Sequence, residues 1–311
     1  MNMNKYFFGI DIGGTAIKAG LFDSHGAMVD HCQIATRLEN HGAEILRDVT
    51  SAAEGCLDEN HLTWQDVTGI GMAVPGPVRD GCFVPLAVNL GWKDINVRDE
   101  MLKLTGIAHV LVENDAKAAA LGEYWKGGWG SYHSAVMITI GTAVGGAVIM
   151  EGKVLPGAFG AAGELSHIQV NPAEPEACAC GKYGHLQQYV SSEGILRRFY
   201  KKTAGKKLLH EISVKDIFDL ARNGDVAASE TVDETAEILG SAMAAVSCVI
   251  DPELYLIGGG VSRAGDFLLE KLRNEFRKHA LPMSADARIE AAKTGNDAGI
   301  YGAVKSVLDL S

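Results

Sequence analysis

The chain alternates short apolar runs with amphipathic segments, and it does so twice. Three short apolar runs divided by turns, at 6–11, 17–22 and 28–34, predict an antiparallel meander. Later apolar runs predict strands at 67–74, 109–112, 134–140, 144–150, 254–257 and 289–292. Apolar residues at helical spacing predict helices at 43–57, 97–104, 116–125, 192–204, 214–222, 229–249, 264–276 and 297–308. This repeated order predicts an α/β fold built by internal duplication.

The length of the chain predicts two lobes, because 311 residues exceed what one core comfortably fills. We place the boundary near Asp115, which gives a small first lobe of residues 1–115 and a large second lobe of residues 116–296. The C-terminal segment, 297–311, is expected to pack back on the first lobe.

Two glycine-rich turns occupy matching places in the two halves. GIDIGGT at 9–15 and IGTAVGG at 140–146 each separate two apolar runs. Glycine lets the backbone approach a ligand closely, and successive free N–H groups in such a turn form an anion site. Either turn alone is also compatible with an ordinary hairpin. Two of them, one in each half, predict a phosphate held from both sides.

The two turns and a third glycine segment carry further candidate groups. We expect Gly13 and Gly14 to adopt positive φ, and the hydroxyls of Thr15 and Thr142 can add donors. Asp11 places a carboxylate beside the turn, where it could hold a hydrated Mg²⁺ ion. A triple glycine at 258–260 follows an apolar run and predicts a nucleotide site at a strand-to-helix turn, with close backbone packing as the alternative.

Asn114 and Asp115 lie between a predicted strand and a predicted helix. One interpretation is a helix N-cap, since Asn and Asp are favoured there and a carboxylate suits the positive helix end. The other is catalytic: a carboxylate at the end of a strand accepts the proton of an attacking hydroxyl. Asn114 can cap while Asp115 acts as the base.

Composition and charge narrow the possible partners. The net charge of −11 argues against nucleic-acid binding through a broad basic face. No apolar run is long enough to span a membrane, and the first residues do not resemble a secretory leader. We therefore expect a cytoplasmic protein with neither a nucleic-acid nor a membrane partner.

The six cysteines fall into two groups. Cys32, Cys56, Cys82 and Cys248 are scattered and are expected to be buried thiols. Four zinc-competent side chains instead fall within a short span: His167, Cys178, Cys180 and His185. Tetrahedral Zn²⁺ accepts two thiolates and two imidazoles, which predicts a closed structural zinc site. The alternative is a pair of loop thiols near two unrelated histidines.

These motifs, in this order, resemble the ROK family (repressor, open reading frame, kinase) of sugar kinases over nearly the whole chain. The matching segments are GIDIGGT at 9–15, VENDA at 112–116, IGTAVGG at 140–146, GELSH at 163–167, CACGKYGH at 178–185, LIGGGVS at 256–262 and GNDAGIYGA at 295–303. Within the family, EYWKGG at 123–128, NLGW at 89–92 and GGGVSRAGDFL at 258–268 look most like the shorter bacterial glucokinases.

The resemblance implies the duplicated actin-like ATPase/hexokinase (ribonuclease H-like) fold, with two lobes closing on ATP·Mg²⁺ and a hexose. It implies ATP-dependent phosphorylation of glucose at the 6-hydroxyl by a homodimer. Alternative substrates are N-acetylmannosamine, another hexose or a β-glucoside, and a sugar sensor without catalysis is a further alternative. Repressors of the family carry a DNA-binding segment before the first strand, for which the position of Gly9 leaves no room.

The resemblance also assigns roles to residues. Asp115 would be the general base, and the sugar would contact Asn89, Asn114, Asp115, Glu164, His167 and Gln187. The phosphates and nucleotide would lie near Gly13, Gly14, Thr15, Thr142, Gly145, Gly259 and Gly260, with Asp11 assisting Mg²⁺. Structural Zn²⁺ would be bound by His167, Cys178, Cys180 and His185.

Four positions depart from the family pattern. His185 replaces the usual Cys, which gives a Cys₂His₂ ligand set. Gln187 replaces a sugar-binding Glu and so loses a charge-assisted bond worth ~1 kcal/mol. Ser166 replaces a glycine and narrows the space beside His167. Ala143 replaces a glycine in the second turn and is expected to be tolerated if this residue has negative φ.

Overall fold

The computed structural model describes residues 5–203 and 212–310, so the predicted helix end at Ala204 lies outside the described residues. The chain forms two compact units. The first unit contains residues up to Ser131, Gly152–Ala162 and the chain from Lys293 onward; the second contains Tyr132–Glu151 and Gly163–Ala292. The first unit therefore extends past the expected boundary at Asp115 to include the helix that this residue begins.

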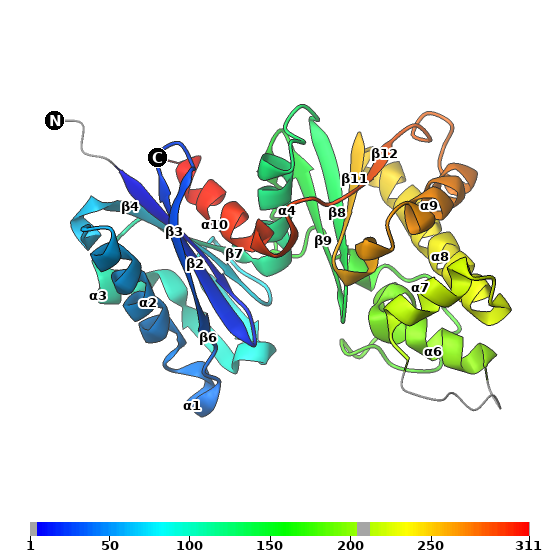
Figure 1. Cartoon of the computed structure of the whole chain (residues 1–311), viewed down its shortest axis with the longest axis horizontal. Helices are drawn as coiled ribbons and strands as arrows, with labels where there is room; N and C mark the ends of the chain where they lie inside the picture. The colour runs from blue at the N-terminus through cyan, green and yellow to red at the C-terminus, as the bar shows by residue number, and fades with distance from the viewer. Residues whose placement is uncertain (1–4, 204–211, 311) are drawn as a thin grey trace. The chain divides into compact units, whose positions relative to one another are not determined.

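The sheet of the first unit has five strands in the order β3-β2-β1-β4-β7 (Figure 1). Their bounds are β1 Tyr6–Ile12, β2 Ala16–Asp23, β3 Met28–Ala35, β4 Val67–Val74 and β7 Val110–Asn114. Strands β1, β2 and β3 pair antiparallel, which confirms the meander. Strand β4 pairs in parallel with β1, and β7 pairs in parallel with β4.

Helices cover both faces of this sheet, as parallel strands require. The bounds are α1 Glu39–Gly42, α2 Ile45–Glu59, α3 Val97–Thr105, α4 Asp115–Lys126 and α10 Ala298–Leu308. Alternate residues of β1 face opposite sides, so Phe8 packs with the buried face of α2 and Phe7 packs with α10. Helices α4 and α10 touch closely, since a Cβ on Gly302 would lie 1.6 Å from the carbonyl oxygen of Ala118.

One feature of the first unit contradicts the sequence interpretation. The stretch from Val78 to Trp92, where the sequence pattern predicts neither a strand nor a helix, contains the strand β5 (Phe83–Ala87) and the start of β6 (Trp92–Asn96), which pair antiparallel. Pro85 lies within β5, and proline inside a short run argues against a strand unless that strand lies at an edge. This hairpin forms a two-stranded sheet of its own.

The second unit repeats the same plan. Its sheet contains β8 (Ser134–Ile140), β9 (Val144–Met150), β11 (Leu254–Gly258) and β12 (Arg288–Ala291), in the order β9-β8-β11-β12. An antiparallel hairpin, β8–β9, is again extended by parallel strands, which confirms the expected internal duplication. Its helices are α5 Gln187–Val190, α6 Ser192–Lys202, α7 Val214–Arg222, α8 Val226–Ile250 and α9 Asp266–His279.

The remaining elements are short. They are β10 (Lys153–Val154) and 3₁₀ turns at Trp64–Asp66, Val88–Leu90, Leu165–His167, Gly260–Ala264 and Gly295–Asp297. Within residues 5–203 and 212–310, no helix combines the length and the apolar content needed to cross a membrane.

Candidate active site

Two carboxylates gather at one edge of the first unit's sheet. Asp11 on β1 lies opposite Ala73 on β4, and Ala73 lies opposite Glu113 on β7. Because these strands run parallel, Asp11 and Asp115 both lie at the carboxyl edge of the sheet. Burial, and next the charge of Asp115, raise the pKa of Asp11 to about 6. The edge therefore concentrates negative charge in a poorly solvated place, as a cation site does.

Asn114 and Asp115 divide the start of helix α4 between them. The Asn114 side-chain oxygen accepts the N–H groups of Ala116 (3.0 Å) and Lys117 (3.2 Å), which confirms Asn114 as the N-cap. Its side-chain nitrogen donates to the carbonyl of Gly76 (3.0 Å), which leaves one amide hydrogen for a ligand. Asp115 is the first helical residue, and its Oδ1 accepts the N–H of Ala116.

The first glycine turn works differently from expectation. Neither Gly13 nor Gly14 adopts positive φ, so that prediction is wrong. Gly13 is required for space, because a Cβ there would lie 2.9 Å from the carbonyl oxygen of Ala16. Asn89 lies beside the same turn, within van der Waals reach of a Cβ on Gly14. Gly13, Gly14 and Thr15, which are expected to bind phosphate, thus share the turn between β1 and β2. Asn89, which is expected to bind sugar, lies next to this turn.

In the second unit, the two glycine segments meet. The turn after β8 carries Thr142, and the triple glycine follows the neighbouring parallel strand β11. Gly259 adopts a φ of 82°, and a Cβ there would lie 2.4 Å from the carbonyl oxygen of Ile140. Gly145 pairs with Thr139 across the hairpin. Ala143 does not adopt positive φ, so the alanine is accommodated as expected.

The four zinc-competent side chains converge. One ligand atom from each of His167, Cys178, Cys180 and His185 lies within 4.8 Å of all the others. Zn²⁺ bound to two sulfurs and two imidazole nitrogens spaces its ligand atoms roughly 3.3–3.8 Å apart. The Cys180 sulfur lies 3.3 Å from His185 Nδ1. The donor set and its spacing therefore fit zinc with little adjustment.

The loop that carries the thiols is built as a tight hairpin. Gly181 and Gly184 both adopt positive φ, and a Cβ on Gly184 would lie 1.7 Å from the carbonyl oxygen of Asn171. Burial raises the pKa of the Cys178 thiol, but N–H groups of Cys180 and Gln187 donate to the sulfur and bring the pKa below its ordinary value. Such donors stabilise a thiolate, the form that binds metal.

Glu164 precedes a short 3₁₀ turn of the second unit, Leu165–His167, and His167 ends it. Glu164 is half exposed, and its Oε2 lies 3.7 Å from His167 Nδ1. The hydroxyl of Ser166, which is buried, lies 2.9 Å from the same nitrogen. Ser166, a departure from the family pattern, therefore orients the imidazole of His167.

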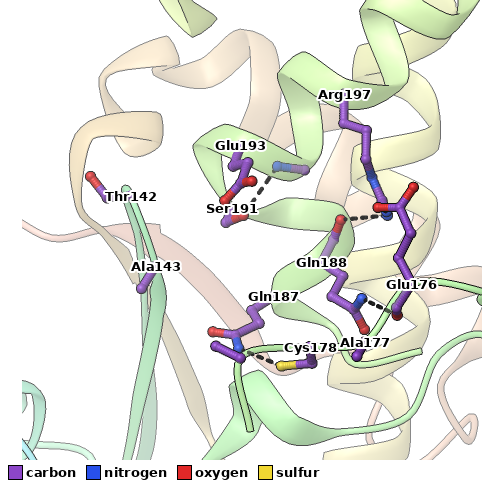
Figure 2. Close-up of a pocket in the computed structure, with 12 residues that line it drawn as sticks. Thr142, Ala143, Glu176, Ala177, Cys178, Gln187, Gln188, Ser191, Glu193 and Arg197 are labelled. Carbon is purple, nitrogen blue, oxygen red and sulfur yellow. Dashed lines mark hydrogen bonds and ion pairs between the residues drawn. The ribbon is translucent and has the colours of Figure 1, made fainter. Parts of the chain in front are cut away.

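A cavity of about 390 Å³ lies in the second unit and joins several of these groups (Figure 2). Its walls include Thr142 and Ala143 from the β8–β9 turn, Cys178 from the thiol loop, and Gln187. Gln187 donates its side-chain N–H to the Cys178 sulfur at 2.8 Å (Figure 2). One expected phosphate residue, one expected sugar residue and one expected zinc ligand thus line a single cavity.

The sequence interpretation missed Arg197, which also lines this cavity. Its guanidinium donates to Glu176 (2.7 Å) and to the carbonyl of Gln188 (3.0 Å) (Figure 2). It also donates to Glu174 (3.0 Å). Glu174 is buried and also accepts the hydroxyl of Tyr189. Arg197 therefore fastens the thiol loop to helix α6. Its two carboxylate partners lie 21 and 23 residues away in sequence, so no local pattern could indicate these contacts.

The expected site residues are divided between the two units. The first unit holds Asp11, Gly13, Gly14, Thr15, Asn89, Asn114 and Asp115. The second unit holds Thr142, Gly145, Glu164, His167, Cys178, Cys180, His185, Gln187, Gly259 and Gly260.

Known proteins are similar to this chain in sequence and in fold. The model of the ROK family matches residues 7–309. A glucokinase of Halalkalibacterium halodurans is 38% identical over 310 residues, covering 96% of this chain and 94% of the relative. A glucokinase of Thermotoga maritima is 32% identical and covers 96% of each chain. The crystal structure of a ROK family glucokinase from Streptomyces griseus, in complex with glucose and AMPPNP, superposes with a TM-score of 0.77 at 31% identity, covering 97% of this chain and 98% of that one.

A match across nearly the whole chain, in both sequence and structure, settles the fold as the actin-like ATPase/hexokinase fold that the motifs implied. The chain belongs to the ROK family.

Proposed function

We propose that the protein is an ATP-dependent glucokinase that transfers the γ-phosphoryl group of ATP to the 6-hydroxyl of glucose. The observation that carries this proposal is the Asp11–Asp115 carboxylate pair at the carboxyl edge of the first sheet, in a chain whose relatives are named glucokinases. Phosphoryl transfer depends mainly on positioning and on neutralising charge, so a base and a cation site at one edge suit it.

Asp115 is the proposed general base. It stands at the first position of α4, where the positive helix end favours its ionised form. An ionised carboxylate can accept the proton of the sugar hydroxyl as that oxygen attacks phosphorus. Asn114 holds the start of the helix and presents its remaining amide hydrogen to the sugar.

Asp11 is the proposed partner of magnesium. Asp11 suits the ion because it is a buried carboxylate next to a second one, and the charge of Lys18 offsets only part of the resulting rise in the Asp11 pKa. Bound Mg²⁺ would neutralise charge on the ATP phosphates. The phosphates themselves are assigned to the turns that contain Gly13, Gly14 and Thr15, and Thr142 and Gly145, with the nucleotide beside Gly259 and Gly260.

The sugar is proposed to contact Asn89 and Asn114 of the first unit and Glu164, His167 and Gln187 of the second. Carboxylate, amide and imidazole groups together can both donate and accept, which suits a polyol. Gln187 donates one side-chain N–H to the Cys178 sulfur, which leaves its side-chain carbonyl oxygen and its second amide hydrogen for the sugar.

A structural zinc ion is proposed at His167, Cys178, Cys180 and His185. The support is the convergence of the four ligand atoms within 4.8 Å. Zinc would fix the thiol loop against the segment that carries Glu164 and His167. Metal analysis of the purified protein is expected to find about one zinc per chain, and a stoichiometry far below one would refute the site.

Two further expectations from the sequence remain proposals: a homodimer, which the family resemblance implies, and a cytoplasmic location. Light scattering of the purified protein tests the first, and cell fractionation tests the second.

A panel of sugars tests the proposed reaction. ADP release is measured with ATP and glucose, N-acetylmannosamine, mannose, fructose or a β-glucoside, with a sugar-free reaction as the blank. Glucose is expected to give the highest kcat/KM. A higher value with another sugar would reassign the substrate. Binding of several sugars without ADP release would replace the kinase by a sugar sensor.

A further inference from the structure

A buried lysine lies in the first unit, within the first turn of the helix that the proposed base begins. Lys117 lies two residues after Asp115 on α4, and only 2% of its surface is exposed. Its ammonium donates to the carbonyl oxygens of Gly160 at 2.6 Å and Pro156 at 3.2 Å. We infer that Lys117 is a positioning residue: it holds the 155–162 loop and thereby sets the place of the sugar-binding segment that follows. The inference rests on the function proposed above.

The 155–162 loop is closed around the ammonium. The N–H of Ala162 reaches the carbonyl of Pro156 at 3.4 Å, and the N–H of Gly160 reaches the carbonyl of Gly157 at 3.3 Å. Gly157 and Gly160 adopt φ values of 75° and 77°, a conformation that favours glycine and bends the loop. The carbonyl oxygens of Pro156 and Gly160, four residues apart, both accept from Lys117 in this bent loop.

Apolar burial does not hold this loop. Phe159 at its tip is 82% exposed, and Leu155 is also exposed. The loop gains one tight backbone contact, because a Cβ on Gly160 would lie 2.6 Å from the carbonyl oxygen of Val78. The charge-assisted bonds from Lys117 are therefore the main polar attachment of the loop to α4.

The charge of Lys117 is part of its role. A buried ammonium is stable only where polar groups replace its water shell, and here carbonyl oxygens do so. Burial raises the pKa of Glu113, and the N–H of Asn114 and the Lys117 charge oppose that rise. A neutral side chain of similar shape would leave both loop carbonyls without their donor.

The loop matters because of what it leads to. From Ala162 the chain continues through Gly163 directly into Glu164 and then the turn Leu165–His167. One turn of α4 therefore carries the proposed base and also anchors the chain that leads to two proposed sugar ligands. Loss of the Lys117 hydrogen bonds would leave the position of Glu164 less well defined. Misplacement of a positioning group by about 1 Å can lower activity up to 100-fold.

Lys126 offers a matched control. It lies at the other end of α4 and donates to a single carbonyl, that of Gly26, at 2.9 Å. Lys117→Met and Lys126→Met make the same chemical change on the same helix, but only the first touches the 155–162 loop. Lys117→Arg keeps a cationic donor and serves as the conservative variant.

The test combines hydrogen exchange with kinetics. In the protein without sugar or ATP, Lys117→Met is expected to lower amide protection across 155–164 by about ten-fold or more, whereas Lys126→Met leaves it unchanged. The KM for glucose is expected to rise about ten-fold in Lys117→Met with a smaller change in kcat, and Lys117→Arg is expected to recover part of both losses.

Unchanged protection of the loop in Lys117→Met would overturn the inference. So would lost protection with an unchanged KM, since the loop would then not position the sugar segment. If Lys117→Met does not fold, the exchange of Lys117→Arg decides between the same two outcomes. The exchange measurement needs no turnover, so it tests the anchor even if the protein phosphorylates none of the sugars tried.

Discussion

Gly299 lies so close to Asp11 that a side chain at position 299 would overlap the Asp11 carboxylate. Gly299 is the second residue of α10, and a Cβ on it would lie 2.3 Å from Asp11 Oδ2 and 2.6 Å from Cγ. The carboxylate is the end of a side chain and can rotate away, whereas the helix backbone cannot.

Gly299→Ala is therefore expected to displace Asp11 without unfolding the protein. Alanine favours the helix by about 1 kcal/mol over glycine, which offsets part of the steric cost. We predict a fall in kcat of about ten-fold or more and weaker activation by Mg²⁺, with the melting temperature nearly unchanged. Steady-state kinetics over a magnesium titration measures both effects.

Gly55→Ala is the matched control, because a Cβ at this position on α2 meets no atom within 4 Å. It should raise stability by about 0.5–1 kcal/mol and leave kinetics alone. Normal magnesium activation in Gly299→Ala would show that Asp11 does not assist the metal.

Ionisation of Asp11 at neutral pH should lower the free energy of unfolding of the ligand-free protein. Burial and the Asp115 charge raise its pKa from the ordinary value of 3.8 to about 6, so the native state binds this proton more tightly than the unfolded chain. The resulting stabilisation is full below pH 3.8 and is lost as the pH rises through 6, an effect of about 3 kcal/mol.

Asp11→Asn removes this titration. Without magnesium, its free energy of unfolding relative to the wild type should rise by about 2–3 kcal/mol between pH 4 and pH 7. Urea unfolding at several pH values with a chelator present measures the difference. A pH-independent difference would show that Asp11 ionises as freely in the folded protein as in the unfolded one.

Glu123 is a buried carboxylate on α4 with a structural task. It accepts the indole N–H of Trp129 (2.8 Å), the backbone N–H groups of Lys293 (2.9 Å) and Thr294 (2.7 Å), and the Thr294 hydroxyl. It thus ties α4 to the chain that enters α10.

Glu123→Gln points an NH₂ group at some of these donors. We expect a loss of about 2–4 kcal/mol in the free energy of unfolding, measured in urea. The same change at Glu100, an exposed residue on α3, should cost under about 0.5 kcal/mol. Equal small losses at both positions would mean that the network adds little stability.

Gln187→Glu should weaken zinc binding. A carboxylate cannot donate to the Cys178 sulfur, and it adds a negative charge beside a thiolate. Loss of such an outer contact typically lowers metal affinity 10–100-fold. Competition with a chromophoric chelator measures the affinity.

Gln188→Glu adds the same charge one residue along, where the side chain contacts the N–H of His185 and the carbonyl of Glu176 and no thiol is involved. Its zinc affinity should fall less than that of Gln187→Glu. An equal fall would assign the effect to charge alone.

Much of the fold could be predicted from local pattern. The strands at Val67–Val74 and Val144–Met150 and the helix Val214–Arg222 have the predicted bounds, because each is an apolar run or stripe closed by clear breakers. The β5–β6 hairpin was missed because Pro85 argues against a strand, and its pairing depends on an edge position that a single sequence does not reveal.

In the candidate site, too, the features set by local sequence could be predicted and those set by distant contacts could not. The thiol and histidine cluster was predictable because its ligands are close in sequence, and the capping by Asn114 because it is local. Gly13 and Gly14 were assigned positive φ, yet the space near Ala16 decides the first of them. Contacts between distant segments, such as Gly299 with Asp11, exist only once the fold is formed.

The most direct test of the proposed function is the turnover and sugar affinity of Asp115→Asn. The account predicts glucose 6-phosphate as the wild-type product, a fall in kcat of about 100- to 10,000-fold in Asp115→Asn, and a calorimetric Kd for glucose within a few-fold of the wild type. Asp99→Asn, in the first turn of α3 in the same unit, should behave as wild type. Near-normal turnover by Asp115→Asn would contradict the account.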